Sequence, residues 1–336
     1  MLKKLVLNNG LRALFYPMAK SPTAAVLFLT RVGSKSETKE LNGISHLLEH
    51  LAFRGTKNWP EPSAIARELD RVCGFYNAFT DKEMVGFWVK AECQNLNLAL
   101  EIIRDMVSSP LFLEKEIAKE KKVIIEEINM REDNPQLAVL ERWEELLYGD
   151  QPAGWPIAGT KKSVSQISRN DLNSHLNRFF ISENSLVALA GGLAAEQIIP
   201  KIKKTFASFK TGRVVPPLLT REIQPKPRTL FQPKETDQTH LCLGVRTFDI
   251  FSPKQYPLQV LAAILGGMMS SRLFEEIREK RGLAYYLRTF PEASGDTGFL
   301  VTHAGVASTK AREAVRLICR ESQRLKEKPE IGRAHV

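Results

Sequence analysis

Cysteine is scarce in this sequence, with four residues among 336. They stand at Cys73, Cys93, Cys242 and Cys319, and no two of them have the C-x-x-C spacing that builds zinc ribbons or redox sites. This spacing argues against a metal or redox centre made of cysteines. We expect all four to be small buried hydrophobic side chains in a reducing cytoplasm.

Long apolar runs are missing as well. Apolar residues make up 43% of the chain and charged residues 26%, which is ordinary for a globular protein. No run approaches the roughly 18 apolar residues that a membrane span needs. The first ten residues turn polar too early for a secretory signal. The sequence therefore predicts a soluble, cytoplasmic protein with no membrane partner.

Acidic residues are in deficit, since 38 Asp and Glu face 48 Lys and Arg, a formal net charge of +10. The basic residues are spread along the whole chain, and short clusters such as Lys201 to Lys204 fall on amphipathic helical patterns. We interpret them as solvated helix faces and expect no nucleic-acid partner. A preference for acidic peptides stays open.

What the sequence does contain is a mixture of strand and helix patterns in two halves. A chain of 336 residues is long enough for two hydrophobic cores. Strand-like runs at 5–16, 24–31 and 75–91 are separated and followed by helical periodicity. We predict an α+β fold of two similar domains, each a mostly antiparallel β-sheet covered by helices.

A proline-rich segment separates the two halves. We predict a first domain over 1–212, an extended linker over 213–228 and a second domain over 229–336. The second half repeats the order of the first with fewer elements, so we expect an incomplete second domain in a chain truncated at its C-terminal end. Residues 331–336 can also be back-translated into a common sequencing-adapter read, which supports that expectation.

The chemistry of the sequence centres on an H-x-x-E-H motif, formed by His46, Glu49 and His50. Helix residues four apart share a face, so the two imidazoles can bind one ion while Glu49 lies beside it. Catalytic zinc takes three protein ligands and keeps a position for water, so a third ligand is needed. Taken alone, the motif could also be incidental polar residues on a helix. The candidates for the third ligand are Glu120, Glu126 and Glu127.

Residues 42–56 resemble, nearly residue for residue, the signature block of the insulinase and pitrilysin family of zinc metallopeptidases, in which the zinc motif is inverted (inverzincins). Residues 123–128 resemble the family block that carries the third ligand. The resemblance covers essentially the whole chain, and it is closest to single-length bacterial relatives of mitochondrial processing peptidase. It implies one Zn²⁺ per chain and hydrolysis of peptide bonds.

The resemblance also implies roles for individual carboxylates. Glu127 would be the third zinc ligand, and Glu49 the general base that activates water. On a helix that turns about 100° per residue, Glu120 projects within about 20° of Glu127, whereas Glu126 points away. Glu120 would then orient one of the ligating imidazoles through its second ring nitrogen.

Further resemblances concern the substrate. Residues 74–80 resemble the family strand that pairs with the substrate backbone, with Asn77 bonding a main-chain group. Residues 266–285 resemble the second family signature, whose Arg278 and Tyr285 would hold the substrate and the oxyanion. In relatives with two such halves per chain, this pair faces the zinc of the opposite half. The resemblance therefore implies a homodimer, with a heterodimer possible.

The predicted function is that of a zinc-dependent endopeptidase that cleaves peptides or presequences inside a closed chamber, with Glu49 as general base. The alternative is a noncatalytic core or assembly subunit, because the family includes proteins that keep the fold and lose the motif. Every motif position is filled in this chain. The sequence does not separate removal of presequences from general peptide degradation.

Overall fold

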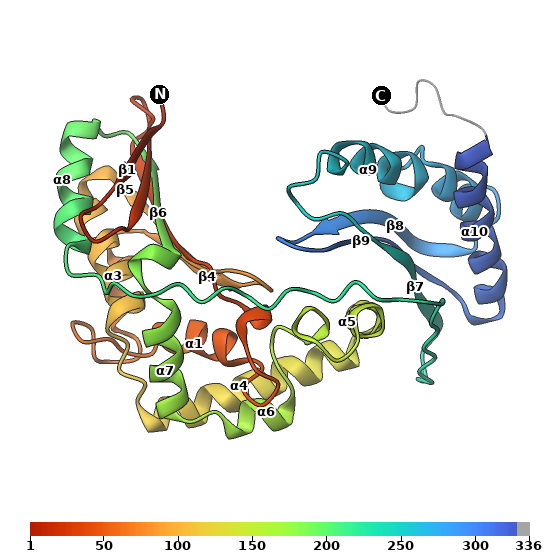
Figure 1. Cartoon of the computed structure of the whole chain (residues 1–336), viewed down its shortest axis with the longest axis horizontal. Coiled ribbons are helices and arrows are strands. Elements are labelled where there is room, and N and C mark those ends of the chain that lie inside the picture. The colour runs from red at the N-terminus through yellow and green to blue at the C-terminus, as the bar shows by residue number, and fades with distance from the viewer. Residues whose placement is uncertain (328–336) are drawn as a thin grey trace. The chain divides into compact units, whose positions relative to one another are not determined.

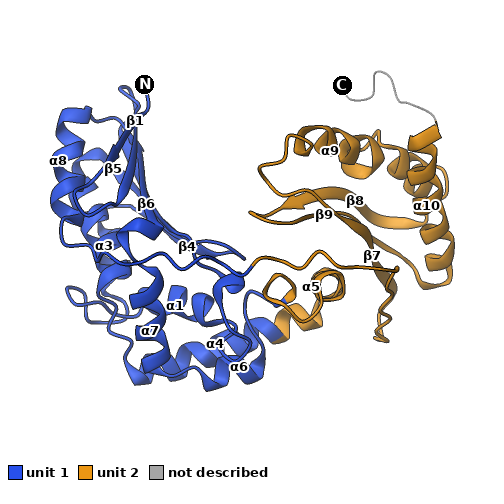
Figure 2. Ribbon diagram, viewed as in Figure 1, with its two compact units in different colours: residues 1–128, 155–218 blue, residues 129–154, 219–336 orange. Residues whose placement is uncertain are grey.

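The computed structural model describes residues 1–327, which fold into two compact units (Figures 1 and 2). Unit 1 comprises residues 1–128 and 155–218, and unit 2 comprises residues 129–154 together with the chain from 219 onward. The expectation about residues 331–336 falls outside the described residues. The predicted α+β class, with helices covering sheets in two parts of the chain, is confirmed.

Unit 1 is built on a six-stranded sheet with the order β1-β2-β6-β3-β5-β4. Neighbouring strands are antiparallel except β2 and β6, which run parallel. The strand β4 lies at one edge of the sheet. The strands are β1 (Lys3–Val6), β2 (Arg12–Pro17), β3 (Thr23–Thr30), β4 (Phe75–Thr80), β5 (Val85–Glu92) and β6 (Ser185–Gly191).

Helices complete unit 1 around a single hydrophobic core. In β3, buried residues alternate with half-buried ones, and Phe28 on the buried side packs on Phe206 of α8 with ring centroids 6.1 Å apart. Helix α1 packs against β4 and α7. The helices are α1 (Ile44–Ala52), α2 (Ala64–Arg71), α3 (Leu96–Ser108), α4 (Glu114–Asp133), α6 (Lys161–Gln166), α7 (Arg169–Phe179) and α8 (Ala195–Phe206), and the last turn of α4 belongs to unit 2.

Unit 2 has a three-stranded antiparallel sheet with the order β7-β9-β8, formed by β7 (Gln238–Thr247), β8 (Ala284–Ala293) and β9 (Gly298–Ala307). Helix α10 (Ala311–Glu327) packs on this sheet through one hydrophobic cluster, and α5 (Pro135–Tyr148) packs through another (Figure 1). Helix α9 (Gln255–Ala262) runs into the π-helical turn η5 (Ala263–Gly267), and a second such turn, η6 (Phe274–Glu279), precedes β8.

The division into units differs from the predicted one over residues 129–154, which were expected in the first domain. Trp143 of α5 packs edge-to-face on Phe299 of β9, with ring centroids 4.8 Å apart. Arg246 of β7 donates a hydrogen bond to the carbonyl oxygen of Leu147. These contacts tie the segment to unit 2. Between Phe206 and Gln238, where the linker was predicted, the chain forms no helix or strand.

None of the four cysteines is fully buried, contrary to the expectation. Cys73 is exposed just after α2, where its backbone takes a φ of 48°, and Cys319 lies on an exposed position of α10. Cys93 and Cys242 are half-buried. Across residues 1–327, no helix combines the length and the apolar character needed to cross a bilayer.

Candidate metal centre

The site begins with the way α1 is fixed at its N-terminus. The buried carboxylate of Glu37 accepts hydrogen bonds from the backbone N–H groups of Gly43, at 2.7 Å, and Ser45, at 2.9 Å. It also accepts one from the side chain of Asn42 at 2.9 Å. An anion at this position satisfies N–H groups that the helix itself leaves unbonded and complements the helix dipole. Burial raises the pKa of Glu37, and the hydrogen bonds oppose that rise.

The same helix start is held from a second side. Gly43 has a φ of 97°, and a Cβ there would meet the carbonyl oxygen of Ala158 at 2.6 Å, so the tight entry into α1 requires glycine. Ser45 Oγ lies 3.1 Å from Nε2 of the buried His175 on α7. Burial lowers the pKa of His175 to about 3, so its imidazole is neutral. These contacts fix the orientation of α1 without a metal ion.

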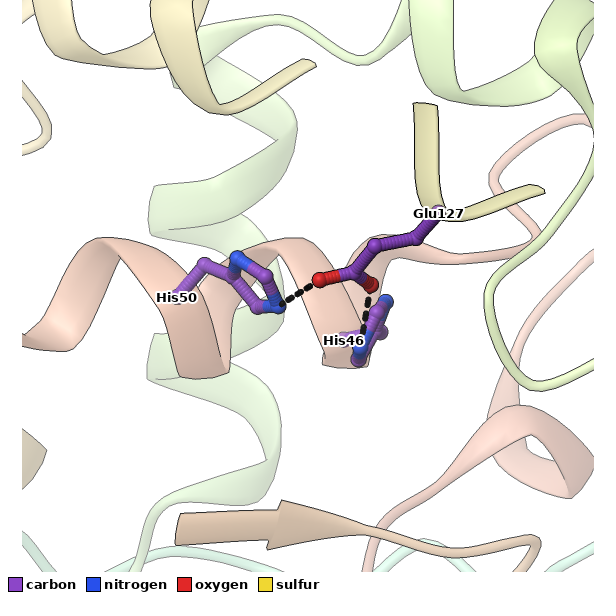
Figure 3. A group of neighbouring side chains, drawn as sticks. All are labelled: His46, His50 and Glu127. Carbon is purple, nitrogen blue, oxygen red and sulfur yellow. Dashed lines mark ion pairs between the residues drawn. The ribbon is translucent and has the colours of Figure 1, made fainter. Parts of the chain in front are cut away.

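Three half-buried side chains from two helices meet beside α1 (Figure 3). His46 and His50 project from successive turns of α1, with ring centroids 4.6 Å apart. The carboxylate of Glu127 on α4 lies between them. Its Oε2 is 3.7 Å from His46 Nε2, and its Oε1 is 3.8 Å from His50 Nε2. Among residues 1–327, this is the group of His, Cys, Asp and Glu that could hold a metal ion.

The donor set fits zinc. The three ligand atoms lie within 4.8 Å of one another. Tetrahedral zinc with ligand distances of about 2.1 Å separates its ligand atoms by about 3.4 Å, close to the distances found here. Two imidazoles and one carboxylate also match a catalytic site, which keeps a fourth position open. Glu126, the competing candidate, is exposed and does not belong to the group.

A second layer of contacts holds His50. Its Nδ1 lies 3.1 Å from Oε2 of the buried Glu120, which leaves Nε2 directed to Glu127. Arg54 Nε in turn lies 2.7 Å from Glu120 Oε1. Burial raises the pKa of Glu120, but the bond from His50 and the charge of Arg54 outweigh it and lower the pKa overall. Glu120 therefore remains a carboxylate that can accept the Nδ1–H of His50.

Glu49 lies on the same face of α1, one turn after His46. The hydroxyl of Thr80, at the end of edge strand β4, donates a 2.6 Å hydrogen bond to Glu49 Oε2. Burial is the main cause that raises the pKa of Glu49; Thr80 and His50 lower it, and Glu127 adds to the rise. A carboxylate with a raised pKa is a better proton acceptor than an exposed one.

Strand β4 presents its free edge next to this group. Asn77 is exposed, and its Oδ1 accepts a 2.9 Å hydrogen bond from the backbone N–H of Ala78. Phe75 and Phe79 are exposed on the same side of the strand. An edge of this kind has backbone groups available to pair with an added strand.

The structure places the other two predicted residues in unit 2. Arg278 is exposed on η6, with its guanidinium carbon 4.8 Å from the centroid of the Phe274 ring. Tyr285 on β8 is 78% exposed. His46, Glu49, His50, Glu120 and Glu127 all come together in unit 1, whereas Arg278 and Tyr285 belong to the other unit.

Sequence reasoning did not identify Glu37, Arg54 or Thr80. Arg54 lies within the block 42–56 and Thr80 within 74–80, whereas Glu37 precedes both. Glu37 binds the N-terminus of α1, Arg54 contacts the buried Glu120, and Thr80 binds Glu49. For Thr80 a signal was available, because it ends the strand already predicted to contact the substrate. For Glu37 and Arg54 no local pattern points to the partner.

Two protein-family profiles together match most of the chain. The profile of the family "Insulinase (Peptidase family M16)" matches residues 16–161, and that of the "Peptidase M16 inactive domain" matches residues 166–334. The "uncharacterized zinc protease YmxG" of Bacillus subtilis is 33% identical over 318 residues, which cover 93% of this chain and 76% of that protein. The chain belongs to the insulinase family, peptidase family M16. Zinc is accordingly its cofactor.

Further relatives extend the comparison. An "uncharacterized zinc protease" of Rickettsia bellii is 36% identical over 346 residues, which cover 98% of this chain and 80% of the relative. Among solved structures, a protease from Helicobacter pylori has a TM-score of 0.94 at 24% identity and covers 99% of this chain and 82% of its own. A chain of complex III2 from Candida albicans has a TM-score of 0.80 at 18% identity, with 99% and 78% covered. These structures show that the M16 fold is shared.

Proposed function

We propose that this M16 protein is a zinc-dependent endopeptidase, with His46, His50 and Glu127 as the metal ligands and Glu49 as the general base. One observation carries the proposal, namely that three ligand atoms from α1 and α4 lie within 4.8 Å of one another on the helix face that also carries Glu49. Its relatives are named zinc proteases, which supports the hydrolysis of peptide bonds.

The proposed mechanism follows from the surroundings of each side chain. His46, His50 and Glu127 would hold the zinc ion, which would supply a Lewis acid for the scissile carbonyl and lower the pKa of a water molecule to about 7. The hydrogen bond from the Thr80 hydroxyl orients Glu49, and burial raises the pKa of its carboxylate. Glu49 takes the proton of the attacking water and passes it to the leaving amine. Glu120 keeps His50 in the tautomer whose Nε2 lone pair faces the metal position.

For the substrate we propose an extended peptide or unfolded protein that adds to the free edge of β4. The N–H of Ala78 is bonded to the Asn77 side chain, so a rotation of that side chain would release the N–H and let Asn77 bond the peptide backbone. Arg278 and Tyr285 are proposed to hold the substrate and the oxyanion. Backbone pairing reads little of the sequence, so cleavage would tolerate many sequences.

The finer predictions about assembly belong to the same proposal. We propose a homodimer as the active unit, with a closed chamber around the sites and the Arg278 and Tyr285 of one chain serving the zinc of the other. In a heterodimer, Arg278 and Tyr285 would serve the zinc of the other chain in the same way. A cytoplasmic location and the choice between presequence removal and general degradation are likewise predictions from the sequence. Cleavage of a peptide library, compared with cleavage of intact precursor proteins, separates the two substrate classes.

The alternative, a noncatalytic core or assembly subunit, draws on the fold shared with a chain of complex III2. That likeness concerns the fold alone. The complete ligand set and the Thr80-bound Glu49 favour the peptidase.

Replacement of single carboxylates tests the proposal. Glu49→Gln should keep about one zinc per chain, because Glu49 is not a ligand, and lose about 10²- to 10⁴-fold in peptidase rate, the usual contribution of a general base. Glu127→Gln should lose the metal itself. Zinc content is measured by mass spectrometry and activity on a quenched fluorescent peptide.

Glu126→Gln is the matched control, because Glu126 is exposed on the same helix and outside the metal group. It should keep both zinc and activity. Full activity in Glu49→Gln that carries zinc would refute the proposed base. Absence of peptidase activity in the zinc-loaded wild type, on every peptide and precursor tried, would favour the noncatalytic alternative.

A further inference from the structure

Strand β8 has a β-bulge at the tyrosine proposed to hold the substrate. Ala284 pairs with Val306 of β9, but the next pair along joins Tyr286 to Gly305. Tyr285 is therefore an inserted residue, so that Tyr285 and Tyr286 together oppose the single residue Gly305. Bulges of this kind redirect side chains and recur next to functional sites.

The bulge turns two successive tyrosines to one face of the sheet. In a regular strand, successive side chains alternate between faces. Here Ala284 and Leu287, on either side of the two tyrosines, are both buried in the hydrophobic cluster that contains Ile318 of α10. Tyr285 and Tyr286 are consequently both on the other face, where Tyr285 is exposed.

Tyr286 is held on that face by two histidines from the other two strands. Its hydroxyl lies 2.8 Å from His240 Nδ1 on β7 and 2.9 Å from His303 Nε2 on β9. A phenol can donate one hydrogen bond and accept another. Burial lowers the pKa of His240 and lowers that of His303 to about 4, so both imidazoles are neutral near pH 7. One can then accept from the hydroxyl while the other donates to it.

Gly305 makes this contact possible. A Cβ at Gly305 would lie 2.4 Å from Cε1 of the Tyr286 ring and 2.7 Å from Oε1 of Gln238. The ring thus crosses the central strand β9 at the position that has no side chain, and its hydroxyl reaches β7. These contacts link all three strands of the sheet. They join the bulge at Tyr285 on β8 to Gly305 and His303 on β9 and to His240 on β7.

We propose that Tyr286, fixed by His240 and His303 above Gly305, is a positioning residue that sets the bulge and thereby the place of the Tyr285 side chain. The proposal rests on the proposed function, in which the Tyr285 hydroxyl contacts the substrate. Tyr286 itself acts through its neighbour. Substitution of Tyr286 should therefore affect catalysis only in a protein whose residue 285 still carries the tyrosine hydroxyl.

A double-mutant cycle tests this dependence. Tyr286→Phe keeps the ring and removes the hydroxyl, and it should lower kcat by about tenfold to a hundredfold, as small misplacements of a catalytic contact do, with zinc content unchanged. Tyr285→Phe should lower kcat at least as far. The double variant should be no slower than Tyr285→Phe alone. Tyr256→Phe, at an exposed tyrosine of the same unit, is the control and should match the wild type.

Two results would overturn the proposal: single effects that multiply in the double variant, or a Tyr286→Phe enzyme as fast as Tyr256→Phe. Full activity of Tyr285→Phe would instead remove Tyr285 from the proposed function. In that case amide hydrogen exchange over residues 284–289 decides the positioning role. Faster exchange in Tyr286→Phe and in Gly305→Ala than in Tyr256→Phe supports it, and equal rates reject it.

Discussion

At the scale of single residues, Arg54 has a role that its position on the surface conceals. Its guanidinium is half-exposed, yet it contacts Glu120, whose carboxylate is only 3% exposed and reaches His50. Removing one partner from a buried carboxylate leaves that group with fewer bonds than its burial requires. Two side chains, Glu120 and His50, thus lie between Arg54 and the metal position, and Arg54 still supports that position.

We expect Arg54→Met to weaken zinc binding by about tenfold, at the low end of what outer contacts of metal ligands contribute. Without the arginine the pKa of Glu120 rises, because Arg54 is one of the causes that lower it, and a protonated Glu120 accepts less well from His50. Chelator competition measures the zinc dissociation constant.

Arg67→Met is the matched control for this prediction. Arg67 also pairs with a carboxylate, that of Glu61, but both side chains are largely exposed, so the pair contributes little. Its loss should leave zinc affinity unchanged. If both variants bind zinc as the wild type does, the contact of Arg54 with Glu120 does not support the site.

At the scale of elements, the start of α1 makes the stability of the protein depend on pH. His175, which lies against Ser45, has a pKa lowered by burial from 6.5 to about 3 in the folded chain. An unfolded chain takes up this proton below about pH 6.5 while the folded chain does not. The stabilisation that comes from the neutral His175 is therefore complete above about pH 6.5 and is lost progressively as the pH falls toward 3. The loss between pH 8 and pH 5 amounts to about 2 kcal/mol.

Replacement of this histidine tests the sign. His175→Gln keeps an amide that can bond Ser45 but does not titrate. Between pH 8 and pH 5 the free energy of unfolding, measured with urea, should fall by about 2 kcal/mol less in the variant than in the wild type. Equal losses in the two proteins would show that His175 is protonated in the folded state as readily as in the unfolded one.

The elements also show how far the sequence alone could lead. The strand-like runs predicted at 24–31 and 75–91 match β3 and the β4–β5 pair within a few residues, because their periodicity is local. The motif of His46, Glu49 and His50 could be recognised in the sequence because its members are about one helical turn apart. Glu127, which is distant in sequence, came from the family resemblance and helix geometry.

What the sequence did not reveal depends on contacts between distant segments. The place of 129–154 is decided by Trp143 packing on Phe299, which no local pattern indicates. The bulge at Tyr285 depends on a glycine in another strand, and the cap on α1 depends on Glu37 meeting backbone N–H groups. Such arrangements follow from tertiary packing and override local propensity.

At the scale of the whole molecule, the proposed exchange of residues between chains can be tested with a mixed dimer. One subunit carries Glu127→Gln and the other Tyr285→Phe, with different affinity tags so that only the mixed species is purified. If Tyr285 serves the partner's zinc, one complete site survives and about half of the wild-type activity should remain. Each altered homodimer should be nearly inactive and serves as the control.

The opposite outcome is equally clear. If Tyr285 serves the zinc of its own chain, the mixed dimer has no complete site and its activity should equal that of the altered homodimers. A protein that sediments as a monomer at the enzyme concentration of the assay, while fully active, would contradict the dimer itself.

The free edge of β4 has a kinetic consequence under the proposed function. A peptide added to this edge would be held by main-chain hydrogen bonds on both sides of the bond that Glu49 is proposed to help break. Hydrolysis cuts the peptide without breaking those bonds, so long fragments leave only as fast as their backbone pairing dissolves. Product length would then govern turnover, and fragments would compete with fresh substrate until they become too short to pair.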